Sequence, residues 1–267
     1  MSFVAVDEAR LARDLWPEGI GRPSKDTDDI ATLPASRVVP ADYKALCQWL
    51  CVDSVDATRP ATVFVNPDVC SEGDTLHEVT LRLQGVVVDV NLNALGNWTG
   101  DVDYAPKAVQ SLRLGSGGYA AAFVPQVQAL RNIRELVLKL MSKPMVGGEG
   151  GGVADILLKR RVFEKVRGGT CGPSVLNRQD DPTGRAAKMS HMWRVTHRIT
   201  VGVQNDDGHI VRASPLVIRR GDFVDVAVTI QVYTMRAHRQ RKTEVQFCPV
   251  EVVRLKTAQE LKVGHLR

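Results

Sequence analysis

The sequence predicts a mainly β protein with a few helices, and two observations support this fold class. Val dominates the apolar residues and often alternates with polar residues along the chain. Val packs well on a pleated sheet and loses side-chain freedom in a helix. Short alternating runs separated by turn residues are typical of a small antiparallel barrel or of a β-sandwich, here with a long basic loop insertion.

The composition divides the chain into five segments. We expect a mobile N-terminal arm over residues 1–35, because this polar stretch has no periodic apolar face. A β-rich lobe with a helix follows over 36–144, then a Gly-rich joint and basic loop over 145–190, an antiparallel barrel or sheet over 191–257 and a C-terminal tail over 258–267. Two architectures remain open: one barrel over 57–257 with a long insertion, or two β-rich lobes that meet at the Gly joint.

Two regions are predicted to be helical. Pro40 opens a helix through Val52, with apolar residues at helical spacing. Residues Gln126–Lys143 fit a helix that turns into a strand near Glu135. The strands expected in the first half are Ala61–Asn66, His77–Leu92, Val109–Arg113 and Tyr119–Val124. Those expected in the second half are Met192–Gln204, His209–Ile218, Phe223–Met235 and Thr243–Leu255.

The strand His77–Leu92 changes phase in its middle. Val79, Leu81 and Leu83 occupy odd positions, whereas the later Val residues occupy even positions. A shift of one residue moves every side chain to the other face of a sheet, so Gly85 is predicted to lie at a bulge or a strong bend.

No catalytic, cofactor or metal signature stands out. The Gly run at 147–152 lacks the Lys and Ser/Thr of a phosphate-binding loop, and is read as a linker. Cys47, Cys51, Cys70 and His77 lack paired ligand spacing, so we expect no metal site. His197 falls on the inward side of its predicted strand and is expected to be structural. We therefore predict a protein that is not an enzyme and needs no cofactor.

The start of the chain lacks the basic and apolar regions of a signal peptide, and no apolar run is long enough to cross a bilayer. We expect an intracellular, reduced protein without a membrane partner.

Charge is distributed unevenly between the two halves of the chain. Residues 1–140 contain 13 Lys and Arg against 18 Asp and Glu, a net charge of −5, whereas residues 141–267 contain 22 against 12, a net charge of +10. A half this basic predicts a polyanionic partner. The candidate binding residues combine basic side chains with two rings expected to face outward, Phe223 and Tyr233. The basic residues are Lys159, Arg160, Arg161, Lys165, Arg167, Arg194, Arg198, Arg219, Arg220, Arg236, Arg239, Arg241 and Lys242.

Cations along a backbone and rings for base stacking are what single-stranded nucleic acid requires. In outline, Ile218–Leu255 also resembles the last strands of an oligonucleotide-binding five-stranded barrel. The first functional hypothesis is therefore a non-enzymatic nucleic-acid-binding protein that prefers single strands of DNA or RNA, with homo-oligomerisation left open. The alternative is a structural assembly protein of the viral coat or movement type. An ordinary solvated β surface and an unseen enzyme site are the competing interpretations.

Overall fold

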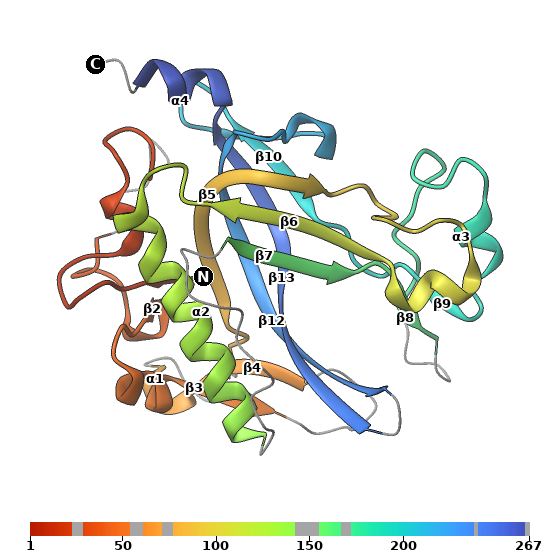
Figure 1. The fold of residues 1–267 in the computed structure, drawn as a ribbon, viewed down its shortest axis with the longest axis horizontal. Coiled ribbons are helices and arrows are strands. Elements are labelled where there is room, and N and C mark those ends of the chain that lie inside the picture. The colour runs from red at the N-terminus through yellow and green to blue at the C-terminus, as the bar shows by residue number, and fades with distance from the viewer. Residues whose placement is uncertain are drawn as a thin grey trace.

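The computed structural model describes residues 1–22, 29–53, 61–70, 77–141, 155–166, 172–237 and 240–264, with the backbone alone for 234–237, 240–242 and 263–264. A large sheet organises the chain (Figure 1). Its main path runs β11 (Ile210–Arg212), β10 (Thr200–Gln204), β13 (Gln240–Lys256), β12 (Phe223–Ala237), β5 (Thr80–Asn91), β1 (Ser2–Val4) and β2 (Val38–Val39).

Six further strands complete the β structure. β4 (Ala61–Val65) pairs with β12 and with β3 (Leu50–Asp53), and β6 (Val109–Gly115) pairs with β5 and with β7 (Ile156–Arg161). A separate small sheet pairs β8 (Glu164–Lys165) with β9 (Trp193–Arg194). The α-helices are α1 (Tyr43–Trp49), α2 (Ala120–Leu140), α3 (Arg185–Lys188) and α4 (Ala258–Gly264). Short 3-10 turns cover Ala12–Leu15, Ala35–Arg37, Pro67–Val69, Val102–Lys107 and Pro215–Val217.

The prediction of a mainly β protein is confirmed, but the sheet is mixed rather than antiparallel. β10 runs parallel to β13, and β1 runs parallel to both β2 and β5. The segment between β11 and β12 crosses over without reversing direction, so β13 returns beside β10 in the same sense. Among the described strands the main path is open, with β11 at one edge and β2 at the other, so no closed barrel is formed there.

Strand β5 bends and exchanges one partner for another. Its first part, Thr80–Val86, pairs antiparallel with β12, and Val86–Asn91 pairs with β6 (Figure 1). The register shift lies between Val87 and Asp89, three residues later than predicted. Leu81, Leu83 and Val87 are all buried, so the odd phase continues through Gly85 and is lost at the exposed Val88. The bulge is therefore at Val88 and not at Gly85, whereas the exchange of partners, where β5 bends, lies next to Gly85.

Helix α2 replaces two sequence predictions. The strand expected over Tyr119–Val124 and the transition to strand near Glu135 are both wrong, because a continuous helix spans Ala120–Leu140. Phe123, Leu130, Ile133 and Val137 are buried. They are separated by seven, three and four residues, and these spacings place side chains on the same face of a helix. Pro125 lacks the N–H of one backbone bond without ending the helix.

The predicted helix Pro40–Val52 is shorter than expected. Helix α1 begins after Asp42, whose carboxylate accepts a hydrogen bond from the Ala45 N–H, and β3 follows directly from Leu50. Asp42 is therefore the N-cap, and Pro40 lies outside the helix.

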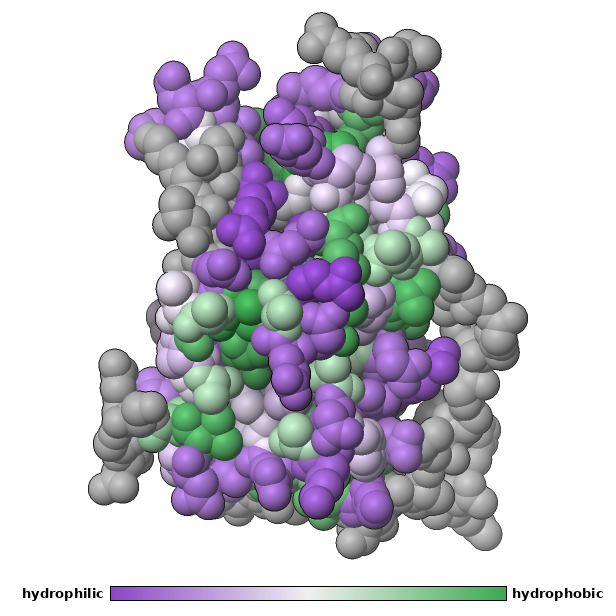
Figure 2. Space-filling view, turned by 90° about the vertical axis from the view of Figure 1, so that its left-hand side faces the viewer, coloured by the Kyte–Doolittle hydropathy of each residue, from purple (hydrophilic) through white to green (hydrophobic). Residues whose placement is uncertain are grey.

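The N-terminal segment is part of the body, so the expectation of a mobile arm is wrong for residues 1–22. β1 lies between β5 and β2 in the sheet. Leu11 is completely buried, and the Trp16 ring packs edge-on against Phe223 with 4.8 Å between centroids. These apolar residues are irregularly spaced, which is why no periodic face marked them in the sequence. The surface on this side of the molecule shows hydrophobic side chains as separate patches between hydrophilic ones (Figure 2).

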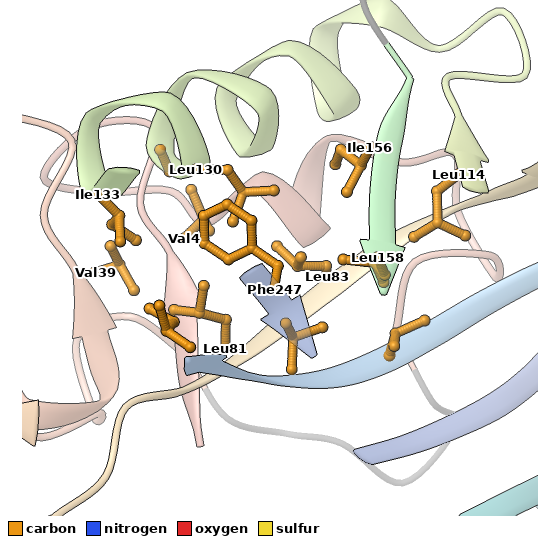
Figure 3. Close-up of a cluster of buried hydrophobic side chains, with 14 of the residues drawn as sticks. Val4, Val39, Leu81, Leu83, Leu114, Leu130, Ile133, Ile156, Leu158 and Phe247 are labelled. Carbon is orange, nitrogen blue, oxygen red and sulfur yellow. The ribbon is translucent and has the colours of Figure 1, made fainter. Parts of the chain in front are cut away.

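The main core spans both expected lobes. Val4, Leu83, Ile133, Leu158 and Phe247 belong to a single cluster, which lies between α2 and the sheet (Figure 3). The direct pairing of β5 with β12 joins strands from segments 36–144 and 191–257. A smaller cluster includes Ala108, Phe163 and Met189, and Trp193 of β9 packs against it. The Gly run at 147–152 lies outside the described residues. Of the helices that are described, none is both long and apolar enough to cross a membrane.

Candidate nucleic-acid interface

Strands β5, β6 and β7 form a three-stranded surface whose two sides differ in chemistry. Leu112, Leu114, Ile156 and Leu158 point into the core and are buried. Alternation along the strands therefore places the intervening residues on the outer side. The register aligns Arg113 with Asp89 and Leu157, and Ser111 with Asn91 and Lys159. We call this outer side the β5–β6–β7 face (Asp89, Asn91, Ser111, Arg113, Leu157 and Lys159).

Two cations on this face have no polar partner in the part of the chain that the structure describes. Within the described residues, the side chains of Arg113 and Lys159 make no hydrogen bond and no ion pair, although Asp89 lies across from Arg113 in the register. Leu157 is 39% exposed beside Arg113. Arg113 was missed by the sequence analysis, although the alternation over Val109–Arg113 places it on the side opposite Leu112 and Leu114.

At the end of β7, Arg161 covers an aromatic ring of β12. The Arg161 guanidinium carbon lies 4.2 Å from the centroid of Tyr233. The Tyr233 hydroxyl donates a hydrogen bond to the side-chain oxygen of Gln231, and burial raises the pKa of the phenol. Arg161 and Tyr233 are thus brought together as predicted site residues, but as a stacked pair and not as a cation beside an uncovered ring.

Arg160 has a structural place. Its side chain is buried, and Nη1 donates a hydrogen bond to the carbonyl oxygen of Pro249 on β13 at 3.4 Å. Burial raises the pKa of the neighbouring Cys248 thiol to about 12, which keeps the thiol protonated at neutral pH. The prediction that Arg160 belongs to a solvent-facing basic surface was wrong, because alternation turns it inward with Leu158.

Lys165, on β8, is exposed.

Arg194 and Arg198 do not share the face of one strand. The predicted strand Met192–Gln204 is divided into β9 and β10, which begins only at Thr200. Arg194 donates to the carbonyl oxygen of Gly172 at 2.9 Å, and Arg198 forms an ion pair with Asp180 at 2.9 Å. Both cations therefore hold the loop that precedes α3. His197 is exposed rather than inward, and its Nδ1 lies 3.1 Å from a Glu164 carboxylate oxygen.

Phe223 cannot stack on a base in this structure. Its side chain is completely buried against Trp16, and β12 is buried from Phe223 to Ile230. The outward position predicted for Phe223 was wrong, because β12 lies between β13 and β5 in the middle of the sheet, where both of its sides are covered.

Arg219 and Arg220 lie together at a pocket of about 380 Å³ beside β5, with Arg254 of β13 as a third basic lining residue. Arg220 Nε donates to the carbonyl oxygen of Val88 at 2.6 Å, which connects this pocket to the edge of the β5–β6–β7 face. Arg254 was not selected from the sequence, since it appeared as one more polar position in a closing strand.

Several predicted site residues stay predictions. Arg236, Arg241 and Lys242 lie in the paired part of the β12–β13 hairpin, where Arg236 is opposite Arg241, but the structure describes only their backbone. Arg167 and Arg239 lie outside the described residues. Within the described part of the chain, no group of three or more His, Cys, Asp or Glu side chains is arranged to hold a metal ion.

The sequence matches no protein-family model, and no curated protein matches it. Among solved structures, the chain is similar to a single-stranded DNA-binding protein from bacteriophage Enc34 in complex with ssDNA. The identity is 10% and the TM-score 0.32, over 77% of this chain and 94% of that chain. The structure of that phage protein without the ssDNA aligns with a TM-score of 0.30 at 10% identity, over 78% of this chain and 89% of that chain. A likeness at this level assigns neither a fold family nor a function to the chain.

Proposed function

We propose that this chain is a non-enzymatic nucleic-acid-binding protein that prefers single strands and binds them across the β5–β6–β7 face. The observation that supports this most is a pair of cations on one solvent-facing sheet surface, Arg113 and Lys159, whose side chains make no hydrogen bond or ion pair with any described residue. A cation without an internal partner is available to a phosphate, and phosphate contacts dominate the affinity for nucleic acids.

The shape of the surface favours a single strand over a duplex. Reading the major groove requires an element that enters it, such as a helix or a two-stranded ribbon. The β5–β6–β7 face is instead the side of a sheet, with Leu157 exposed between its cations. The bases of an unpaired strand can contact an aliphatic side chain or a guanidinium plane, whereas a duplex keeps its bases stacked inside.

The aromatic contribution is smaller than the sequence suggested. Phe223 is buried, and Arg161 covers Tyr233, so a base at this end of the face would meet the Arg161 guanidinium first. Arginine stacks on planar groups and contacts phosphate bidentately, so it can serve either part of a nucleotide.

A salt-titrated binding assay tests the proposal. Labelled oligonucleotides of one sequence, single-stranded and double-stranded, are compared by fluorescence anisotropy. We expect tighter binding of the single strand, with log affinity falling against log salt by about 0.7 for each phosphate contact. Arg113→Gln should weaken binding and reduce this slope. Arg131→Gln is the matched control, because Arg131 is exposed on α2, away from the face.

Two results would overturn the proposal. Affinity that does not change between low and physiological salt would remove the electrostatic basis. Equal losses in Arg113→Gln and Arg131→Gln would show that net charge matters and that the β5–β6–β7 face does not.

The edge strand β11 favours a second candidate function, self-assembly. β11 pairs only with β10 among the described strands, and Ile210 and Val211 are 50% and 55% exposed. An apolar sheet edge with unpaired backbone groups can pair with the same edge of another copy. Size-exclusion chromatography of the wild type and Val211→Lys tests this function. Large particles that disappear in the variant support assembly, and a monomer at all concentrations contradicts it.

A further inference from the structure

Three arginines converge on the pocket beside β5. Arg219 and Arg220 belong to the turn before β12, Arg254 lies near the end of β13, and Thr257 also lines the pocket. Asp222 is the acidic residue in the lining, so the described lining side chains carry three positive formal charges against one negative. A pocket with this excess charge suits an anion.

Asp222 has structural partners that account for its presence. One of its carboxylate oxygens accepts a hydrogen bond from the Arg219 N–H at 2.9 Å, and the other accepts from the Ala258 N–H at 3.1 Å. It therefore fixes the turn before β12 to the chain after β13. Its distance to Arg254 Nη1 is 3.9 Å, which is too long for a hydrogen bond.

The three guanidinium groups are held to different degrees. Arg254 Nη1 donates to the Val217 carbonyl oxygen at 2.8 Å, which fixes its orientation and leaves donors without a protein partner in the described chain. Arg220 is oriented by its bond to the Val88 carbonyl oxygen. The Arg219 side chain is exposed, with no hydrogen bond or ion pair to any described residue.

We propose that this pocket binds a phosphate group of the nucleic-acid strand that crosses the β5–β6–β7 face. The proposal rests on the proposed function and adds a defined phosphate subsite to it. Arginine forks match the oxygens of a phosphate bidentately, and two oriented forks lose little freedom when they bind. The link from Arg220 to Val88 places the subsite beside β5, at the border of the face. The phosphate is either an internal diester or a terminal monoester, and the experiment separates these two.

The experiment compares oligothymidines that end in a 5′-phosphate, a 3′-phosphate or only hydroxyl groups, by fluorescence anisotropy. The variants are Arg219→Gln, which removes no hydrogen bond or ion pair to a described residue, and Arg254→Gln, whose folding is checked by thermal melting. Arg131→Gln on α2 is the control with the same loss of charge. We expect Arg219→Gln to weaken binding by about three- to tenfold, as the loss of one charge-assisted contact would.

Each outcome decides the matter. A loss confined to one phosphorylated oligonucleotide supports a terminal monoester in the pocket, and an equal loss for all three supports an internal diester. If Arg219→Gln and a folded Arg254→Gln bind as Arg131→Gln does while Arg113→Gln is impaired, the subsite is overturned and the proposed function stands. If the wild type binds none of the three, both are overturned.

Discussion

The guanidinium group of Arg161 lies over the ring of Tyr233, 4.2 Å from its centroid, and this contact joins the end of β7 to β12. Tyr233 is mostly buried, and its hydroxyl is bonded to Gln231, so the ring is a fixed platform. A cation held on such a platform at the end of the β5–β6–β7 face needs little ordering before it contacts a ligand. In the proposed function, Tyr233 is a positioning residue for Arg161.

This relationship gives the first prediction. Arg161→Gln and Tyr233→Leu should both weaken single-strand binding, whereas Tyr233→Phe should leave it within about twofold, because the ring remains. A cation–π contact contributes about 0.5–2 kcal/mol, depending on its burial. Binding and urea denaturation are measured on the same samples, so that a loss of affinity can be separated from a loss of stability. Equal affinities of the wild type and a folded Tyr233→Leu would contradict the positioning role.

The second prediction concerns the contact between Glu164 and His197. The hydrogen bond from His197 lowers the pKa of the Glu164 carboxyl below its ordinary value. A lowered folded-state pKa stabilises the fold above the ordinary pKa of Glu, and this contribution is lost as pH falls through the folded value. Both groups are about half exposed, so the effect on the free energy of unfolding should stay below about 1 kcal/mol. In His197→Gln, the pKa of Glu164 should rise toward its ordinary value in a carboxyl NMR titration. An unchanged titration would mean that the contact is absent in solution.

The sequence predicted the mainly β fold because the alternation of apolar and polar residues depends only on the strand itself and is present in most strands. It could not predict that β12 is buried on both sides. The alternation of Phe223–Met235 indicates one apolar side, but Phe223, Asp225 and Ala227 on the other side are buried as well. The partners that cover them come from distant segments: Trp16 for Phe223, and Arg82 and Gln84 for Asp225. No spacing rule within the strand contains that information.

The sequence predicted that the candidate site is basic, but it did not predict correctly which basic residues form the site. Basic side chains of the second half do gather, with Lys159 and Arg161 on β7 and Arg219 and Arg220 at the pocket. Arg194 and Arg198 are instead used internally, by Gly172 and Asp180. Arg113 was missed because the candidate residues were selected from the basic half of the chain, and Arg113 lies in the acidic half. Pairing of β6 with β7 brings it beside Leu157.

The third prediction follows from the packing of the N-terminal segment. Trp16 is 5% exposed and contacts both Phe223 and Tyr119. Trp16→Ala should lower the free energy of unfolding by about 3–5 kcal/mol, since a large buried side chain leaves a cavity. Deletion of residues 1–22 should be at least as damaging, because it also removes β1 from the sheet. Chemical denaturation of the full chain and both variants tests this prediction. A deletion variant with wild-type stability would contradict it and would support the mobile arm that the sequence predicted.

The last prediction concerns Gly85, which lies where β5 changes partner from β12 to β6. Its backbone does not require glycine, since its φ is not among the positive values of this chain. The constraint is space: an added Cβ would lie 3.0 Å from Leu114 Cβ and 3.0 Å from Phe123 Cε2, both in the main core. Gly85→Ala should therefore destabilise the fold by about 1–3 kcal/mol, which is typical of overpacking, and Gly85→Val by more.

Gly172→Ala is the control for this prediction, because a Cβ at Gly172 meets nothing within 4 Å. Suppose that position 85 needs glycine for its conformational freedom. The loss in the free energy of unfolding of the double variant Gly85→Ala/Phe123→Leu would then equal the sum of the losses in the two single variants. If space is the reason, the smaller side chain at 123 should recover part of the loss, and a double-mutant cycle should show coupling of about 0.5 kcal/mol or more. Denaturation midpoints of the four proteins in that cycle decide between strain and crowding at the bend of β5.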